Sequence, residues 1–345
     1  MRVRSPLRLA INGYGRIGRC FLRALQERGD AAFVVTAINE PADLASIAYL
    51  TRFDSTHGRF AGSVETRDDA LWIDGQRIAV CHATTPEAVD WAGLGVDLVV
   101  ECSGRYGERR EIERFLRAGA PRLLLSHPAN SAADVDATIV FGVNHRELSG
   151  QEKIVSAASC TTNAVVPLLA LMDRELGVER ALLTTLHSVM NDQPLIDGYH
   201  HADLRRTRSA MQSIIPVATG LARGVERLLP RLAGRVTAKA IRVPTTNVSA
   251  IDMVLALRQP ADAETLKALL VHAAQDAWRN LIAWSDEIHA SIDFNHDPHS
   301  AIVDGGVTRC VAPGCANLFV WFDNEWGFVN RMLDVIEYWH TLRDA

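Results

Sequence analysis

The chain has 345 residues, 48% of them hydrophobic, and 36 Lys and Arg against 41 Asp and Glu give a formal net charge of −5. This length favours two domains, and the hydrophobic content excludes a disordered chain. The negative charge argues against a general nucleic-acid binder. No apolar run is long enough to cross a bilayer, and the first residues lack the apolar core of a signal peptide, so we expect a cytoplasmic protein with no membrane partner.

The first half of the chain alternates apolar strands with helices. Strands are predicted at residues 7–12, 33–38, 97–102, 122–125 and 138–142. Helices are predicted after the first strand, ending near Gly29, and at residues 108–118. Continuous apolar strands separated by helices are typical of a doubly wound parallel sheet covered on both faces, which places this half in the α/β class.

The second half has longer strands and fewer helices. Strands are predicted at residues 182–187, 237–243, 247–257 and 317–322, and helices at 263–282, near Cys160, and at 328–342. This pattern favours an α+β domain with a mainly antiparallel sheet. The last helix places Met332, Val335, Ile336, Trp339 and Leu342 on one face, so it needs an apolar surface to pack on.

A glycine-rich turn lies between the first strand and the first helix. Gly13, Gly15 and Gly18 form the pattern GxGxxG in this position. The first glycine allows a tight turn, the second lets a pyrophosphate approach the backbone, and the third lets helix and strand pack closely. The alternative is a glycine-rich turn with no ligand. The order of strand, motif and helix favours a dinucleotide site at the helix N-terminus.

Glu40 ends the second predicted strand. A carboxylate there can accept hydrogen bonds from the adenosine ribose hydroxyls and would repel a 2′-phosphate, so NAD is favoured over NADP. The alternative is a solvated loop glutamate.

Cys160 stands at a predicted helix start, between Ser159 and Thr161. The helix dipole there favours the thiolate, the reactive form of cysteine. Pro167 lies inside the same apolar run and leaves the helix boundary uncertain. His187 ends a predicted strand and could act as the base for Cys160, although a lone histidine at a strand end is more often structural.

Arginines and cysteines raise further possibilities. Arg205, Arg206 and Arg208 are equally compatible with phosphate binding and with a solvated loop or subunit contact. Arg242 has apolar neighbours at the end of a strand, which favours a specific anionic partner. The six cysteines form no CxxC pair and, apart from the adjacent Cys81 and His82, none has metal-ligand spacing to a histidine, so we expect reduced thiols and no metal site.

Four motifs together resemble the glyceraldehyde-3-phosphate dehydrogenase superfamily nearly end to end. They are residues 12–19 (NGYGRIGR), 159–163 (SCTTN), 242–245 (RVPT) and 323–327 (DNEWG). The resemblance implies an NAD-binding Rossmann domain at residues 1–159, on which a C-terminal helix at 325–345 packs back, and a catalytic domain at 160–324. It also implies a homotetramer, in which the stretch 189–214 reaches a neighbouring subunit's cofactor.

The resemblance implies a role for each site residue. Cys160 would attack an aldehyde, His187 would act as base, and hydride would pass to NAD. The cofactor would be held by Gly13, Gly15, Arg16, Ile17, Gly18, Glu40, Ser103 and Asn324. An inorganic-phosphate pocket would comprise Ser159, Thr161, Arg208, Thr219 and Gly220, and a substrate-phosphate pocket would comprise Asp192 and Arg242.

At two positions the sequence departs from the family pattern, and these departures concern the substrate, which we expect to be a phosphorylated aldose. Met190 stands where phosphorylating members carry a threonine, and a thioether cannot replace its hydroxyl as a donor. Ala157 replaces a usual asparagine, for which we have no physical account. Met190 and the segment Tyr199–Arg208 favour erythrose 4-phosphate, with water cleaving the thioester. The alternatives are phosphate-dependent oxidation of glyceraldehyde 3-phosphate in glycolysis, and a non-catalytic NAD- or RNA-binding protein.

Overall fold

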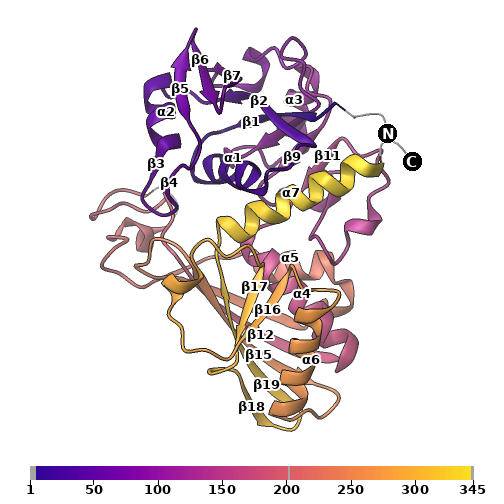
Figure 1. Ribbon diagram of the computed structural model, residues 1–345. Coiled ribbons are helices and arrows are strands. Elements are labelled where there is room, and N and C mark those ends of the chain that lie inside the picture. Colours follow the sequence, from indigo (N-terminus) through magenta and orange to yellow (C-terminus); the bar gives the residue numbers. More distant parts are fainter. Residues whose placement is uncertain (1–4, 201–202, 343–345) are drawn as a thin grey trace. The chain divides into compact units, whose positions relative to one another are not determined.

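The computed structural model describes residues 5–200 and 203–342 (Figure 1). Residues 1–4, 201–202 and 343–345, which fall in the expected domain ends and in the segment Tyr199–Arg208, lie outside the described residues. The chain divides into two compact units. The first comprises residues 1–139, 145–159 and 329–345, and the second comprises residues 140–144 and 160–328. No helix in the described part combines the length and hydrophobicity needed to span a bilayer.

The first unit is built on a nine-stranded sheet with the order β10-β11-β9-β8-β1-β2-β7-β6-β5. Its strands are β1 (Leu7–Asn12), β2 (Phe33–Asn39), β5 (Val64–Arg67), β6 (Ala70–Ile73), β7 (Gln76–Cys81), β8 (Leu98–Glu101), β9 (Leu123–Leu125), β10 (Ala137–Thr138) and β11 (Ile154–Ser156). The pairings from β10 to β7 are parallel, and β5, β6 and β7 pair antiparallel at one edge. The mostly parallel sheet confirms the α/β prediction.

The helices of this unit are α1 (Arg16–Arg28), α2 (Leu44–Arg52) and α3 (Arg109–Arg117), with short turns η1 (Pro86–Ala88), η2 (Ala132–Asp134) and η3 (His145–Glu147). Strands β3 (Phe53–Asp54) and β4 (Gly58–Arg59) form a separate small hairpin. Helix α1 ends at Arg28 and is capped by Gly29, which has a left-handed φ of 61°. From Val329 on, helix α7 (Trp326–Thr341, yellow in Figure 1) also belongs to this unit, and Arg28 bonds to Asn330 and Asp334 on it.

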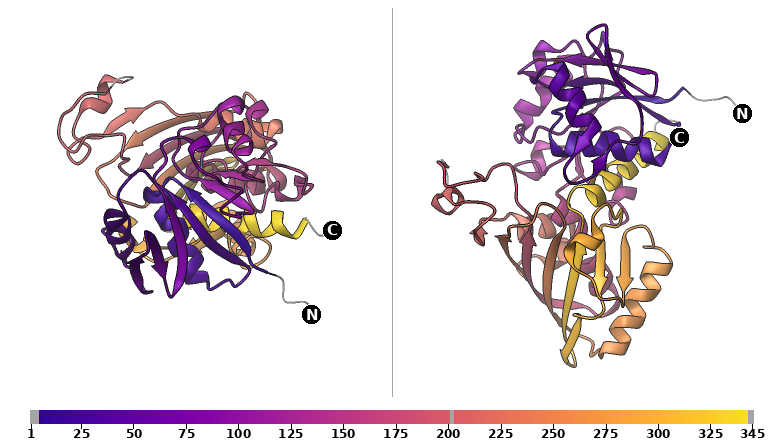
Figure 2. Two further views of the ribbon diagram at one scale, coloured as in Figure 1. Left: turned by 90° about the horizontal axis from the view of Figure 1, so that it is seen from above. Right: turned by 60° about the vertical axis from the view of Figure 1, so that its left-hand side comes forward.

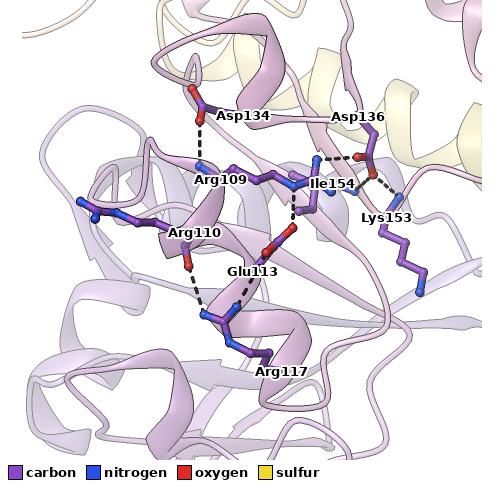
Figure 3. A network of polar contacts seen from close by, with 8 residues as sticks. All are labelled: Arg109, Arg110, Glu113, Arg117, Asp134, Asp136, Lys153 and Ile154. Carbon is purple, nitrogen blue, oxygen red and sulfur yellow. Dashed lines mark hydrogen bonds and ion pairs between the residues drawn. The ribbon is translucent and has the colours of Figure 1, made fainter.

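A polar network anchors α3 beside β11 (Figure 3). Arg109 donates to Glu113 at 2.8 Å and to Asp136 at 2.6 Å. The other oxygen of Asp136 accepts from the backbone N–H groups of Lys153 and Ile154 at 2.8 and 2.9 Å. The network therefore connects the first turn of α3 with the start of β11, the neighbour of edge strand β10.

The second unit contains an eight-stranded sheet in which seven strands follow the order β13-β14-β12-β15-β19-β17-β16 and β18 pairs with β19. Its strands are β12 (Val178–His187), β13 (Ile215–Val217), β14 (Val236–Arg242), β15 (Ser249–Leu257), β16 (Ile282–Ser285), β17 (Ala301–Asp304), β18 (Arg309–Ala312) and β19 (Cys315–Phe322). The pairs β12–β14 and β16–β17 are parallel and the others antiparallel. This confirms the mainly antiparallel sheet.

Helices α4 (Cys160–Glu175), α5 (Leu221–Leu228) and α6 (Ala263–Gln275) accompany this sheet, with short turns η4 (Leu204–Thr207), η5 (Pro230–Leu232) and η6 (Ser291–Phe294). Helix α4 packs against β12 and β17, and nearly all of its residues from Thr162 to Met172 are buried. A helix that is apolar around its circumference requires such burial. It continues through Pro167, which removes one intrahelical hydrogen bond.

Two predicted elements are wrong in part. The strand expected at residues 138–142 ends at Thr138. The N–H of Ile139 still donates to the carbonyl oxygen of Ser156. The chain then turns, because the N–H of Val140 donates to the Asn144 side chain instead of to a strand. The helix expected at residues 263–282 ends at Gln275. Its last predicted residue, Ile282, instead begins β16 and pairs with Ala301 of β17.

Candidate active site

The three glycines of the first loop meet different steric conditions. Gly13 has a φ of +86°, and a Cβ there would lie 2.6 Å from the backbone nitrogen of Ser103. A Cβ on Gly18 would lie 2.3 Å from the carbonyl oxygen of Gly13. A Cβ on Gly15 would meet nothing within 4 Å. Backbone geometry and packing therefore require the outer two glycines, whereas Gly15 faces open space, as the approach of a pyrophosphate requires.

The other residues expected at the cofactor lie around this loop. Arg16 and Ile17 form the first turn of α1, whose N-terminal N–H groups and dipole suit an anion. The Glu40 carboxylate, just after β2, accepts a 2.8 Å hydrogen bond from the backbone N–H of Tyr14 inside the loop. Glu40 is partly exposed, so it can hold the loop while facing a ribose. The structure therefore brings Glu40, Ser103 and the glycine loop together at the carboxyl ends of β2, β8 and β1.

A buried polar chain that the sequence analysis missed supports this edge of the sheet. Glu101, at the end of β8, accepts from the Ser103 backbone N–H at 2.7 Å, the Gly104 N–H at 3.2 Å, the Ser103 hydroxyl and the Asn12 amide. Asn12 in turn accepts from Asn39 at 2.7 Å. The signal in the sequence was that β1, β2 and β8 each end on a polar residue that can bond to its neighbour.

Glu101 should make the stability of the first unit depend on pH. Burial raises the pKa of Glu101 to about 7, because its effect outweighs that of the hydrogen bonds from Ser103, Asn12 and Gly104, which lower the pKa. The folded state therefore keeps the proton between about pH 4.5 and 7, where the unfolded chain loses it. The free energy of unfolding should fall across this window by roughly 1–3 kcal/mol and not fall further above it.

Glu101→Gln tests this expectation, because glutamine does not titrate. Denaturant unfolding of the full chain at several pH values should give a flatter profile for Glu101→Gln than for wild type. Glu65→Gln, at an exposed glutamate on β5, serves as the control. Parallel profiles for wild type and Glu101→Gln would contradict the assignment.

Cys160 occupies the first turn of α4, directly after Ser159. As the first residue of a 16-residue helix it lies at the positive end of the dipole, which favours the thiolate. The Thr161 hydroxyl lies 3.8 Å from the Cys160 sulfur. Two residues before the cysteine, buried Ala158 adopts a left-handed φ of 60°, a strained conformation of a kind that clusters at functional sites.

The structure places His187 beside this thiol. Its Nε2 lies 3.6 Å from the sulfur of Cys160, so the two residues paired from the sequence do meet. The ring is 8% exposed, and its other nitrogen, Nδ1, lies 2.9 Å from the carbonyl oxygen of Ser188. Phe322 of β19 packs edge-on against the ring. A buried imidazole fixed at both nitrogens is suited to proton transfer with the thiol.

Asn324 is held in one orientation by two serines that the sequence analysis did not single out. Its Oδ1 accepts from the hydroxyls of Ser188 at 3.0 Å and Ser249 at 2.8 Å. With Oδ1 bonded to both hydroxyls, Nδ2 lies on the other side of the amide. Asn324 can therefore present a fixed N–H donor, as its expected role toward a carboxamide requires.

Asp323 organises the backbone around Asn324. It is 1% exposed, and its oxygens accept from the N–H groups of Glu325, Trp326 and His296 and from the Asn247 amide, at 2.7–2.9 Å. His296 and Val248 both have left-handed φ values, 72° and 61°. Such a value is a rare outlier for β-branched valine. The buried carboxylate therefore bonds to strained His296 and to Asn247, the residue before strained Val248, and it directly precedes Asn324 in the chain.

The expected phosphate ligands are only partly assembled. Arg242 lies beside His187, with its Nη1 2.7 Å from Nδ1. Asp192 pairs instead with Arg206 at 3.0 Å, and Arg208 pairs with Asp197 at 2.9 Å. Thr219 and Gly220 precede α5, and the Thr219 hydroxyl accepts from the Leu221 N–H at 3.2 Å. In the described residues, neither Asp192 with Arg242 nor Arg208 with Thr219 forms a direct hydrogen bond.

Comparison with known families matches both units. Residues 7–109 match the domain described as glyceraldehyde 3-phosphate dehydrogenase, NAD binding domain. Residues 159–324 match the one described as glyceraldehyde 3-phosphate dehydrogenase, C-terminal domain. The first match contains the glycine loop, Glu40 and Ser103, and the second contains Cys160, His187 and Asn324. NAD is therefore the cofactor, and the protein is an NAD-dependent oxidoreductase that belongs to the glyceraldehyde 3-phosphate dehydrogenase family.

Proposed function

We propose that the protein oxidises D-erythrose 4-phosphate to 4-phospho-D-erythronate through a thioester on Cys160 that water hydrolyses. The observation that carries the aldehyde chemistry is the Cys160–His187 pair, with 3.6 Å between sulfur and Nε2 at the start of α4. A nucleophile with a base in contact is what covalent aldehyde oxidation requires.

The proposed steps use these residues in order. The Cys160 thiolate attacks the aldehyde carbon, and the His187 imidazolium protonates the resulting oxyanion, which gives a hemithioacetal. His187 then accepts the hydroxyl proton back at Nε2 while the hydride leaves that carbon, which yields the thioester. After this proton has passed to solvent, water adds to the thioester carbonyl and gives a proton to Nε2, the carbon–sulfur bond breaks, and the acid and the thiolate are released.

Bound NAD⁺ supplies the hydride acceptor for this reaction. Gly13, Gly15 and Gly18 with Arg16 and Ile17 would hold its pyrophosphate, and Glu40 its adenosine ribose. Ser103 would lie along its nicotinamide half. The amide of Asn324, fixed by Ser188 and Ser249, would orient the nicotinamide carboxamide.

Met190 supports the choice of substrate and of water. It is 38% exposed, in the segment 189–214, and offers no hydroxyl to a substrate phosphate. A four-carbon substrate places its phosphate differently from a three-carbon one, so the missing hydroxyl fits erythrose 4-phosphate. Thr219 and Gly220 keep the phosphorylating pattern, which makes glycolytic oxidation of glyceraldehyde 3-phosphate the second candidate.

Omission of inorganic phosphate separates the two candidates. With erythrose 4-phosphate and NAD⁺, NADH should form over many turnovers in phosphate-free buffer, because water completes the cycle. A single burst of one NADH per subunit that resumes only with phosphate would support the second candidate. The ratio of kcat/KM for the two aldehydes then ranks them as substrates.

The segment 189–214 supports a further proposal, a homotetramer. Figure 2 shows its described residues, 189–200 and 203–214, extending away from the rest of the second unit. It exposes Leu195, Ile196, Tyr199, Leu204 and Ile214, each by more than two thirds, and exposed apolar groups this dense mark an interaction surface. A monomeric mass in sedimentation at micromolar concentration would contradict it.

The proposed setting is the cytoplasm, in a route to pyridoxal 5′-phosphate, with no nucleic-acid partner.

A further inference from the structure

The two contacts of His187 Nδ1 require opposite protonation states of that atom. Arg242, the neighbour of His187 across the parallel β12–β14 pair, places Nη1 2.7 Å from Nδ1. A guanidinium can only donate, so this contact needs a lone pair on Nδ1. The carbonyl oxygen of Ser188, 2.9 Å from the same nitrogen, can only accept, so that contact needs a hydrogen there.

Each contact therefore defines a different state of the ring. While Arg242 donates to Nδ1, the neutral ring carries its proton on Nε2, which faces the Cys160 sulfur and cannot take the thiol proton. In this state Arg242 Nη1 also lies 3.4 Å from the Ser188 carbonyl, which keeps a donor. When Nδ1 instead donates to Ser188, the lone pair of Nε2 faces the sulfur, and Nε2 can act as the base.

We propose that Arg242 is a positioning residue that holds His187 in the inactive tautomer until an anion draws the guanidinium away. The proposal rests on the proposed function, in which Arg242 binds the phosphate of the substrate. Once Arg242 turns to the phosphate, Nδ1 takes its proton by exchange and donates it to Ser188. Nε2 then accepts the thiol proton, which yields an imidazolium and the Cys160 thiolate.

The surroundings of the ring are consistent with this control. The titratable Cys160 from α4 and the charged Arg242 from β14 each face one ring nitrogen, and β19 contributes the uncharged Phe322. An imidazolium carries hydrogens on both nitrogens, so it would set an N–H against the guanidinium N–H groups at 2.7 Å. The contact with Arg242 and the charged ring therefore exclude each other.

Alkylation of Cys160 by iodoacetamide at pH 7 tests the proposal, with glycerol 3-phosphate as a phosphate monoester that has no aldehyde. The probe should raise the wild-type rate on the order of tenfold, whereas glycerol at matched ionic strength should not. In Arg242→Met, whose side chain has no donor, Cys160 should be alkylated faster than in wild type without glycerol 3-phosphate. Adding glycerol 3-phosphate should not change that rate. Arg231→Gln, at an exposed arginine on η5, should behave as wild type. A wild-type alkylation rate that glycerol 3-phosphate does not change would overturn the proposal.

¹⁵N NMR of wild-type protein labelled on histidine measures directly which ring nitrogen of His187 carries the proton. His187 should be protonated on Nε2 without the probe, and on Nδ1 or on both nitrogens with it. Protonation on Nδ1 in the probe-free protein would overturn the proposal, whatever the alkylation rates. Turnover of erythrose 4-phosphate is measured separately. If the His187 tautomer changes with the probe but erythrose 4-phosphate is not turned over, only the proposed function is rejected. If erythrose 4-phosphate is turned over normally but the tautomer does not change, only this role of Arg242 is rejected.

Discussion

Cys160→Ala is expected to lower kcat/KM for aldehyde oxidation by about 10⁴-fold or more, because no other group can form the thioester. NAD binding, measured by fluorescence titration, should stay within about twofold of wild type, since the expected cofactor ligands do not include the thiol. The control is Cys315→Ala, at another partly exposed free cysteine, which should keep full turnover. A Cys160→Ala variant with wild-type turnover would exclude the covalent mechanism.

His187→Asn is expected to lower kcat by about 10²–10⁴-fold, the usual contribution of a general base. With glycerol 3-phosphate present, it should also slow alkylation of Cys160 at neutral pH, because the ring that then takes the thiol proton, 3.6 Å from the sulfur, is gone. His272→Asn, at an exposed histidine on α6, is the matched control. Unchanged alkylation and turnover in His187→Asn would reject the pair.

Local patterns were sufficient to predict the cofactor loop. Strand, GxGxxG and helix are adjacent in the sequence, and the roles of Gly13, Gly15 and Gly18 depend on contacts within a few residues or on a neighbouring strand end. The same holds for Cys160, whose place at a helix start follows from Ser159 and the apolar run after it. Each of these predictions needed only short-range information.

Pairing between distant segments explains what the sequence could not predict. The residues after Gln275 continue an apolar pattern, but Ile282 pairs with Ala301, a partner that no local period reveals. Asn324 is oriented by Ser188 and Ser249, which lie 136 and 75 residues before it. The contact of Arg242 with His187 depends on the register of β12 and β14. Register is set by the fold and not by either strand alone.

The two phosphate pockets, one expected to contain Arg208 and the other Asp192, show a further limit. The sequence motif assigned both residues to phosphate, yet the structure pairs them with Arg206 and Asp197 within the same exposed segment. Exposed ion pairs of this kind contribute at most about 1 kcal/mol, so a phosphate or a neighbouring subunit could exchange them at little cost. The resemblance therefore implies these residues but does not predict how they are arranged in an isolated chain.

Rapid acid quench followed by peptide mass spectrometry shows directly whether Cys160 is acylated during turnover. The protein is mixed with erythrose 4-phosphate and excess NAD⁺, quenched within the first turnover, and digested. The peptide containing Cys160 should gain the mass of a 4-phosphoerythronyl group, and the corresponding peptide of Cys160→Ala should not. NADH formed in the first turnover without acylation of the Cys160 peptide, or with acylation of another residue, would contradict the covalent mechanism.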